Sequence, residues 1–570
     1  MSILAGSKCY RFMAAAICHK CQWNILRFRH ECLNSSHVFR RTQFNAVNEP
    51  NTGVSEELWN FEDKLFNYLS DNNGKVSVDR FLSVLFSTGL TKKDPRLKEC
   101  IQKINSVRTD LAKSGHEGVV SLDKEKFRFC ISDNNLLIAK AFQNKFVIPE
   151  FPDFCQQIEK LYWKVKANTS GKVASYIPQL SRYSPDLWGV SICTVDGQRY
   201  SIGDLSVPFC LQSVSKPMTY ALLLKELGSS LVHEYVGQEP SGVTFNHISL
   251  NHLNKPHNPL INSGALVVCS LLRQDMDPAD RFDFTSKYFK MMTGNEYLAF
   301  NNSIFLSERL SADRNFALGY YLRENKCFPE GTNLKDILDF YFQLCSVEIT
   351  CESGAVIGAT FANGGICPIT DHKILDSDAV RNTLSLMHSC GMYDYSGQFA
   401  FKVGLPAKSG VSGAILIVVP NLMGICIWSP PLDMYGNSCR GLQFAEELVQ
   451  MFNFHNYDSI YHQKKLDPRL RNTTSLAMLV VEMLFSAKTG DVTSLRRCAM
   501  SGMNMSMSDY DSRTALHVAA AEGHLPAVEF LVEKCSVSPF LKDRWGFTPL
   551  DDAKRFEKND VAEFLEKNMS

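Results

Sequence analysis

The chain has 570 residues, which exceeds the usual domain size of about 100 to 200 residues and predicts three or four folding units. Its 45% hydrophobic and 21% charged residues are typical of a globular chain and exclude disorder throughout. Sixty basic and sixty acidic residues cancel, so no overall field favours nucleic acid or an anionic membrane. Nineteen irregularly spaced cysteines indicate a reducing compartment. The longest apolar stretch, 413–428, is interrupted by Pro420-Asn421, so we expect no transmembrane helix.

Residues 1–48 form a strongly basic leader. This segment holds seven lysines and arginines against the single acid Glu31. Arginine and serine with few acids, among interspersed apolar residues, are typical of a mitochondrial transit peptide. We therefore expect import into the mitochondrial matrix, and a disordered basic tail is the alternative.

Residues 55–145 show apolar residues at helical spacing and predict a small helical module. The segment 71–77 between two such helices resembles the loop of an EF-hand. Aligning Gly74 with the obligatory sixth position of that loop places Leu69 and Arg80 where calcium ligands are required. We therefore expect an EF-hand-like module that does not bind calcium and serves interaction or oligomerisation.

Residues 154–455 alternate helical stretches with pairs of strands. Two hairpins are predicted, 189–195 with 199–202 around Asp196-Gly197, and 414–419 with 423–428 around Pro420-Asn421. Strands thus lie at both ends of this region, with mostly helical sequence between them. This order predicts an α+β domain whose antiparallel sheet is completed by both ends, with a helical subdomain in the middle.

Residues 475–567 contain an internal repeat. Thr514-Ala515-Leu516-His517 returns as Thr548-Pro549-Leu550-Asp551, and Gly490 returns as Gly523, at the spacing of about 33 residues that ankyrin repeats have. Two to three repeats fit in this segment. Such repeats often present a concave face to a protein partner, and a role in assembly or stability alone remains the alternative.

Ser213 and Lys216 are the first candidates for catalysis. Pro217 is tolerated only in the first turn of the helix predicted for 218–227, so both residues lie at or just before its start and share one face. A neutral lysine can take the proton of a serine hydroxyl, and amides at the helix start suit the resulting oxyanion. Ser215 is the rival nucleophile, but its side chain should diverge from that of the adjacent Lys216.

Lys408-Ser409-Gly410 is the second candidate motif, expected immediately before a strand over 411–419. Serine hydrolases of the β-lactamase and penicillin-binding group combine Ser-x-x-Lys with a late Lys-Thr/Ser-Gly strand beside the pocket. Gly410 would let the substrate approach the backbone, and the amide of Val411 would serve as the second oxyanion donor. The order of the two motifs predicts a β-lactamase/transpeptidase-like catalytic domain.

Four motifs make a family resemblance specific: Tyr176 to Leu180, Gln212 to Pro217, Pro256 to Ala265 and Gly404 to Gly413. With them the chain resembles the phosphate-activated mitochondrial glutaminases. The resemblance covers essentially the whole chain, in the order of leader, helical module, catalytic domain and ankyrin repeats. It implies hydrolysis of L-glutamine to L-glutamate and ammonia through a serine acyl-enzyme, in glutamine catabolism.

The resemblance also implies roles for individual residues. Ser213 would be the nucleophile, Lys216 the general base and Tyr393 the proton relay. The main-chain amides of Ser213 and Val411 would form the oxyanion hole. The substrate-binding residues would be Tyr176, Gln212, Ser213, Asn262, Glu308, Asn315, Tyr341, Tyr393 and Val411. In this set Glu308 suits the substrate ammonium, and the neutral donors Asn262, Asn315 and Tyr341 suit its carboxylate.

The resemblance further implies a homotetramer that needs no metal and no organic cofactor and is activated by inorganic phosphate. The regulatory loop would lie within 242–251 and include Phe245, His247, Ile248 and Ser249. Where the family has an arginine and a lysine, this chain has Thr244 and His247, which removes one permanent charge and makes the other titratable. We therefore expect a phosphate response that is weaker or more dependent on pH. Liver-type or kidney-type assignment, the ankyrin partner and filament formation stay open.

Two other functions are compatible with parts of the pattern. A serine amidase or esterase could act on another small amide, but a substrate without an α-ammonium would give Glu308 no role. A catalytically silent ankyrin scaffold should lack a catalytic residue. The presence of Ser213, Lys216, Tyr393 and Lys408 together favours the enzyme.

Overall fold

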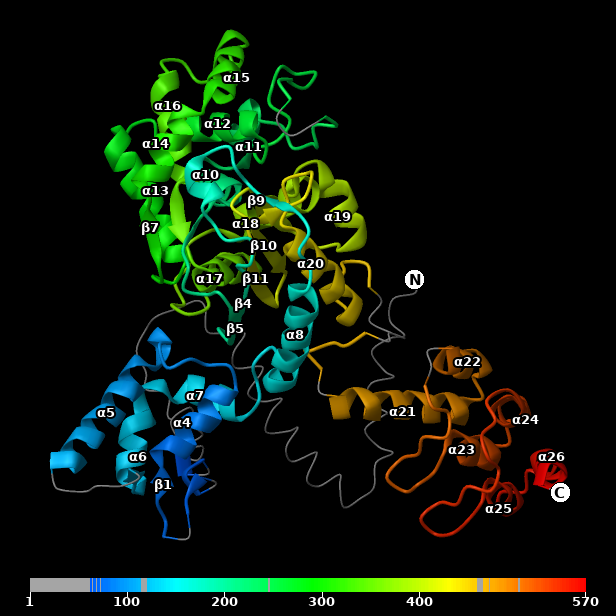
Figure 1. The fold of residues 1–570 in the computed structure, drawn as a ribbon. Helices are drawn as coiled ribbons and strands as arrows, with labels where there is room; N and C mark the ends of the chain where they lie inside the picture. Colours follow the sequence, from blue (N-terminus) through cyan, green and yellow to red (C-terminus); the bar gives the residue numbers. More distant parts are fainter. Residues whose placement is uncertain are drawn as a thin grey trace, which may run out of the picture. The chain divides into compact units, whose positions relative to one another are not determined.

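A computed structural model describes most of the chain from residue 62 onward (Figure 1). The described residues are 62–63, 65–67, 69–71, 73–113, 120–243, 247–458, 465–470, 472–500 and 503–569. The predicted leader, residues 1–48, and the start of the helical module at residue 55 lie outside them. None of the helices in the described ranges is long and apolar enough to cross a membrane.

From residue 73 onward, the described part of the helical module contains α-helices, 3₁₀ turns and one short pair of strands. Its elements are β1 (Val76–Ser77), α4 (Val78–Ser87), η2 (Pro95–Leu97), α5 (Lys98–Lys113), β2 (Ser121–Leu122), α6 (Lys124–Ile131), η3 (Ser132–Asn134) and α7 (Asn135–Phe142). β1 pairs antiparallel with β2, and the Phe81 and Phe127 rings meet edge to face in the core. Leu69, at the expected first position of the calcium loop, is 2% exposed. It packs in the core and offers no side-chain oxygen to a cation.

A five-stranded antiparallel sheet forms the centre of the next region. Its strands are β4 (Gly189–Thr194), β5 (Arg199–Gly203), β9 (Ala407–Gly410), β10 (Ala414–Val419) and β11 (Met423–Trp428). They lie in the order β5-β4-β11-β10-β9, and Ile192 of β4 faces Ile425 of β11. The prediction that both ends of the region complete one antiparallel sheet is confirmed, as are the two predicted hairpins.

Both faces of this sheet are covered by helices, which explains why β10 and β11 are apolar throughout. Ile415 and Ile417 point to the side where α8 (Phe151–Lys166) and α20 (Cys439–Met451) pack. Leu416 and Val418 point to the opposite side, with α17 (Cys351–Ala362). Figure 1 shows α17 beside β4, β10 and β11. Alternate residues of a strand face opposite sides, so a doubly covered strand needs apolar residues at every position.

The remaining elements of this region form the helical subdomain and two small sheets. The helices are α9 (Pro178–Ser181), α10 (Ser215–Leu227), α11 (Ser229–Tyr235), α12 (Asn262–Leu271), α13 (Pro278–Met292), α14 (Asn302–Leu310), α15 (Asp313–Glu324), α16 (Leu334–Cys345), α18 (Ser377–Cys390) and α19 (Ser396–Lys402). The strands are β3 (Lys172–Val173), β6 (Phe209–Cys210), β7 (Leu298–Phe300), β8 (Val347–Ile349) and β12 (Pro431–Leu432). β8 lies between β6 and β7, and β3 pairs with β12. Helices α12, α14 and α15 all pack on α16.

The C-terminal region consists of paired helices. They are α21 (Asn472–Thr489), α22 (Val492–Met500), α23 (Ala515–Glu522), α24 (Leu525–Glu529), α25 (Pro549–Arg555) and α26 (Asn559–Met569). Thr514 caps α23 by accepting from the His517 amide, and Thr548 caps α25 in the same way. The His517 ring lies 3.2 Å from the carbonyl oxygen of Phe547 and so ties one repeat to the next. Thr514 and Thr548, which the sequence repeat aligns with each other, therefore play the same structural role in successive repeats.

One predicted element differs from the structure. A single strand was expected over 411–419, with Lys408-Ser409-Gly410 leading into it. Instead, Lys408, Ser409 and Gly410 lie inside β9, a turn follows, and β10 begins only at Ala414. Gly413 has φ +91°, and its amide donates to the Gly410 carbonyl at 2.9 Å, which closes the turn.

Candidate active site

Ser213 and Lys216 meet at the start of α10. Residues 212–214 form a single 3₁₀ turn, and α10 continues directly from Ser215, so the two side chains project from consecutive positions of one helical surface. The Nζ of Lys216 lies 3.0 Å from the Oγ of Ser213. The predicted pairing of hydroxyl and amine is therefore present in the structure.

The environment of Lys216 favours its neutral form. The residue is 4% exposed, and burial lowers the pKa of its amine to about 8. Its Nζ also donates to the Oδ1 of Asn262 at 2.7 Å, and the Tyr341 hydroxyl donates to the same oxygen at 3.2 Å. Asn262 is the first residue of α12 and Tyr341 lies in α16, so two further helices position the amine. A lysine in this setting can act as a base near neutral pH.

Ser215, the rival nucleophile, is used for structure. Its Oγ donates to the carbonyl oxygen of Gln212 at 2.7 Å, and the residue is 2% exposed. This bond closes the turn that leads into α10 and leaves the hydroxyl proton engaged away from Lys216. The structure thus separates the two serines as the sequence pattern predicted.

Strand β9 brings the second motif against the first. An added Cβ at Gly410 would lie 2.8 Å from the carbonyl oxygen of Leu211, so only glycine allows β9 to come this close to the turn at Ser213. Lys408 is fully buried, and its Nζ donates to the carbonyl oxygen of Ser409 at 2.8 Å. Burial, and then the charge of Lys216, hold the pKa of Lys408 well below its usual range. A positive charge on Lys216 therefore disfavours a second one on Lys408.

Tyr393 completes the cluster from a strained turn. It lies in η5 (Tyr393–Tyr395) with φ +53°, a region that non-glycine residues rarely adopt. Burial raises the pKa of its hydroxyl, and hydrogen bonds with the Ser213 side chain and the Val411 main chain oppose that rise. The Nζ of Lys408 lies 4.5 Å from the centre of the Tyr393 ring. The phenol therefore stays protonated at neutral pH between the nucleophile and Val411.

Glu308 is held by two other predicted substrate-binding residues, Tyr176 and Gln212. The carboxylate accepts from the Tyr176 hydroxyl at 2.6 Å and from the Gln212 Nε2 at 2.7 Å. Burial raises its pKa, and these two hydrogen bonds counteract the rise. Tyr176 is 48% exposed as a whole, but its hydroxyl end is enclosed, and burial raises the pKa of that hydroxyl. Gln212 also has positive φ, +49°, next to the nucleophile.

Two groups of predicted residues stand apart from this network. Asn315 is half-buried in the first turn of α15, and within the described ranges no hydrogen bond joins it to the other site residues. In the predicted regulatory loop, His247 is exposed while Ile248 and Ser249 are half-buried. Phe245 and Thr244 lie outside the described residues.

One neighbour of the site was not predicted. The loop 433–437 lies against Tyr393, and the Asn437 side chain donates to the carbonyl oxygen of Met392. In the sequence, 433–437 is an ordinary turn pattern, with Asp433, Gly436 and Asn437 as its turn-forming residues. The sequence indicates a turn after the last strand of the sheet. No feature of the neighbouring sequence shows that this turn contacts Tyr393.

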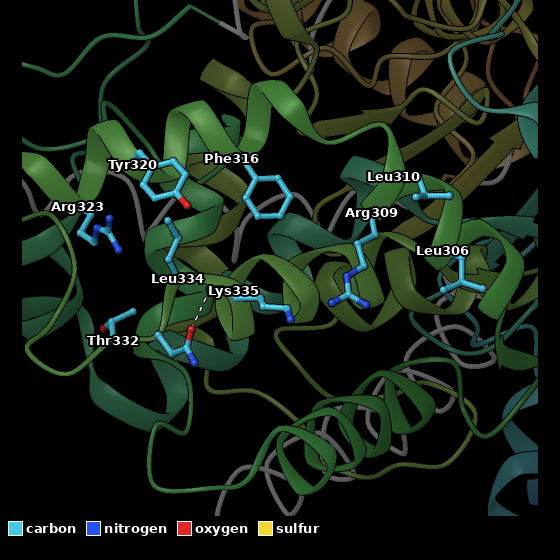
Figure 2. Close-up of a pocket in the computed structure, with 10 residues that line it drawn as sticks. Leu306, Arg309, Leu310, Phe316, Tyr320, Arg323, Thr332, Leu334 and Lys335 are labelled. Atoms are coloured by element: carbon cyan, nitrogen blue, oxygen red, sulfur yellow. Dashed lines mark hydrogen bonds between the residues drawn. The ribbon is translucent and has the colours of Figure 1, made fainter.

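A wide groove opens beside helices α14, α15 and α16 (Figure 2). It has a volume of about 730 Å³ and is lined by Leu306, Arg309, Leu310, Phe316, Tyr320, Arg323, Thr332, Asn333, Leu334 and Lys335. None of the predicted site residues is among them. The chemistry described above therefore belongs to the enclosed cluster around Ser213, whose groups converge, and not to this larger opening. The described residues also contain no group of three side chains placed to bind a metal.

Comparison with known proteins agrees with this geometry. The family model described as Glutaminase matches residues 171–457, the segment that contains all the site residues above. The chain belongs to the glutaminase family. Models described as EF-hand domain and Ankyrin repeats (3 copies) match residues 61–149 and 483–569. The predicted fold class, an EF-hand-like module followed by a β-lactamase-like glutaminase domain and ankyrin repeats, is confirmed.

Similar proteins extend over most of the chain. The glutaminase liver isoform, mitochondrial, of Mus musculus is 54% identical over 505 residues, which are 88% of this chain and 83% of that protein. The same isoform of Rattus norvegicus is 53% identical over the same shares. A solved structure of Mglu in its tris and glutamate form is 34% identical with a TM-score of 0.51, covering 54% of this chain and 68% of that one.

Family membership establishes the activity. This glutaminase hydrolyses the side-chain amide of L-glutamine to give L-glutamate and ammonia. The predicted enzyme class is confirmed, and the reading as a silent scaffold or as an amidase for an unrelated amide is not supported.

Proposed function

We propose that hydrolysis proceeds through an acyl-enzyme on Ser213, with Lys216 as the base. The observation that supports this most is the 3.0 Å separation between the Ser213 hydroxyl and a buried amine whose pKa lies near 8. Lys216 takes the hydroxyl proton while Oγ bonds to the amide carbon of glutamine. The main-chain amides of Ser213 and Val411 stabilise the oxyanion.

The proton then leaves with the product. It passes from Lys216 to the amide nitrogen, directly or through the Tyr393 hydroxyl, and the C–N bond breaks to release ammonia. Water attacks the ester carbon in the second half of the reaction, and the same base takes its proton. Breakdown of the second oxyanion returns the proton to Ser213 Oγ and frees glutamate.

The substrate would be oriented by charge. Glu308 pairs with the α-ammonium, and its two hydrogen bonds from Tyr176 and Gln212 keep the carboxylate pointed to one side. Asn262, Asn315 and Tyr341 supply neutral donors for the α-carboxylate. Such a site distinguishes an amino acid from a simple amide or ester.

Replacement of the nucleophile tests the mechanism. Ser213→Ala should lower ammonia release from glutamine by about 10³-fold or more, because no acyl-enzyme can form. Ser215→Ala is the matched control, and its kcat should stay within about threefold of the wild type. Circular dichroism and thermal melting check that both variants fold. Turnover by folded Ser213→Ala near the wild-type rate would remove Ser213 as the nucleophile.

Replacement of the carboxylate tests the substrate class. Glu308→Gln keeps the shape and removes the charge, so kcat/KM for glutamine should fall about 100-fold or more. Cleavage of a small ester without an α-ammonium should change by less than about threefold, because Glu308 has no partner in that substrate. Equal losses on the two substrates would contradict the proposed pairing.

We also propose that the enzyme works in the mitochondrial matrix as a homotetramer activated by inorganic phosphate. The mitochondrial designation of the mouse and rat relatives and the basic segment 1–48 support the location. The ankyrin repeats offer a surface for a protein partner. Immunogold labelling or protease protection in isolated mitochondria tests the location.

A further inference from the structure

The loop 433–437 forms a rigid turn beside the proposed proton relay. The Asp433 carboxylate accepts from the amides of Tyr435 and Asn437, both at 2.9 Å, and the Asp433 amide donates to the Asn437 carbonyl at 2.8 Å. A Cβ added to Gly436 would lie 3.8 Å from the Tyr393 ring and 3.9 Å from Val411. The loop therefore lies directly over the relay, and its shape does not depend on the Asn437 side chain.

The Asn437 side chain reaches the residue before Tyr393. It is fully buried, and its Nδ2 donates to the Met392 carbonyl oxygen at 3.3 Å. That carbonyl belongs to the peptide that leads into Tyr393, whose φ of +53° costs about 1 kcal/mol or more. Ser396 holds the same turn from within, because its Oγ accepts from the Met392 amide and donates to the Tyr393 carbonyl. Asn437 adds a tie from a separate part of the chain.

Stability alone does not explain an asparagine at this position. Its Oδ1 is buried and has no hydrogen-bond partner among the residues that the structure describes. Leaving a polar atom in that state costs about 1–3 kcal/mol. A residue that makes one hydrogen bond and leaves the other half of its amide unsatisfied is a poor choice for the core, unless the bond it makes serves the reaction.

We propose that Asn437 is a positioning residue for Tyr393. It fixes the peptide plane before Tyr393, so the phenol hydroxyl stays between Ser213 and Val411 and can pass the proton to the leaving ammonia. This role rests on the proposed function of Tyr393 as the relay. Misplacing a catalytic group by about 1 Å costs up to about 10²-fold in rate, so a single bond to the backbone suffices for a measurable effect.

Asn437→Ala tests the assignment in the full-length enzyme. We expect kcat for glutamine to fall about tenfold or more with KM within about threefold, because positioning acts on the chemical step. The melting temperature should stay equal or rise, because the unsatisfied Oδ1 is removed. Asn363→Ala is the matched control: it removes a similar amide-to-carbonyl bond, Nδ2 to the Ile366 oxygen at 3.0 Å, and should leave kcat unchanged. A lower melting temperature with proportionate loss of folded enzyme, or unchanged kcat, would overturn the proposal.

A double variant distinguishes the role proposed for Asn437 from the role proposed for Tyr393, on which it rests. If Asn437 acts through Tyr393, adding Asn437→Ala to Tyr393→Phe should lower kcat by less than about twofold further. Losses that multiply in the double variant would show that Asn437 acts elsewhere. Unchanged kcat in Tyr393→Phe alone would instead contradict the relay itself, whatever Asn437→Ala does.

Discussion

Lys216 is the residue on which the chemistry depends. Its amine is enclosed by α10, α12 and α16, with Ser213 at 3.0 Å and Asn262 at 2.7 Å. Neither neighbour carries a charge that would stabilise an ammonium, so burial dominates and lowers the pKa to about 8. Burial thus lets the amine act as a base near neutral pH. At lower pH the amine is protonated and cannot accept the Ser213 proton, so activity falls.

The pH dependence of turnover follows from this pKa. Only neutral Lys216 can accept the Ser213 proton, so kcat should rise about tenfold per pH unit below an inflection near 8 and level off above it. Stopped assays of ammonia release between pH 6 and 9.5, in buffers of constant ionic strength, measure the profile. A flat kcat between about pH 6.5 and 8.5 would show that Lys216 is not the titrating base.

At the scale of elements, α17 and β11 determine how firmly the sheet is held. Gly424 of β11 lies against the main chain of α17, where an added Cβ would overlap the Ala359 amide nitrogen and the Gly358 carbonyl carbon. Backbone packs directly on backbone there, and no flexible side chain can move aside. The sheet in turn carries β9, and so the position of Lys408 and Gly410 beside Ser213 depends on this contact.

Gly424→Ala should therefore destabilise the catalytic domain by about 3 kcal/mol or more, because α17 must shift. Gly397→Ala is the matched control: Gly397 lies exposed in α19 with nothing within 4 Å of an added Cβ, and alanine should raise stability by up to about 1 kcal/mol. Chemical denaturation followed by tryptophan fluorescence measures both. Equal midpoints for the two variants would contradict the close packing.

The elements and the site differ in how far sequence predicts them. The hairpin of β10 and β11 is bounded by Pro420-Asn421 and apolar throughout, so local pattern suffices. The strand expected over 411–419 merged Val411 with the apolar run of β10, although Ser412 and Gly413 lie between them and Gly413 has positive φ. Ser213 and Lys216 are near in sequence and were paired correctly. Asn437 and Met392 lie far apart in the sequence, and no local pattern indicates that they are in contact.

At the scale of the whole molecule, three kinds of domain share one chain, and the catalytic one contains all the described chemistry. We propose that phosphate and subunit assembly regulate the enzyme. The family resemblance assigns this regulation to the loop that contains His247. His247 is exposed, so a small anion in solution can reach its side chain. Histidine carries less positive charge than lysine above neutral pH, which weakens attraction for an anion.

His247→Lys should consequently strengthen phosphate activation. We expect the variant to be activated at least about twofold more than the wild type at pH 8.5, because lysine adds a permanent positive charge at this position. Activity titrations with sodium phosphate, alongside light scattering to measure the oligomer, give both the response and the assembly. The same activation in the two proteins would show that position 247 does not sense phosphate.

The most direct measurement traps the covalent intermediate. Enzyme turning over glutamine is quenched in acid within milliseconds, digested and mapped by mass spectrometry. The account predicts a glutamyl ester on the peptide that contains Ser213, with fragment ions that locate it on Ser213 and no such adduct in Ser213→Ala. A glutamyl group on Ser215, on a cysteine or on any other residue would contradict it.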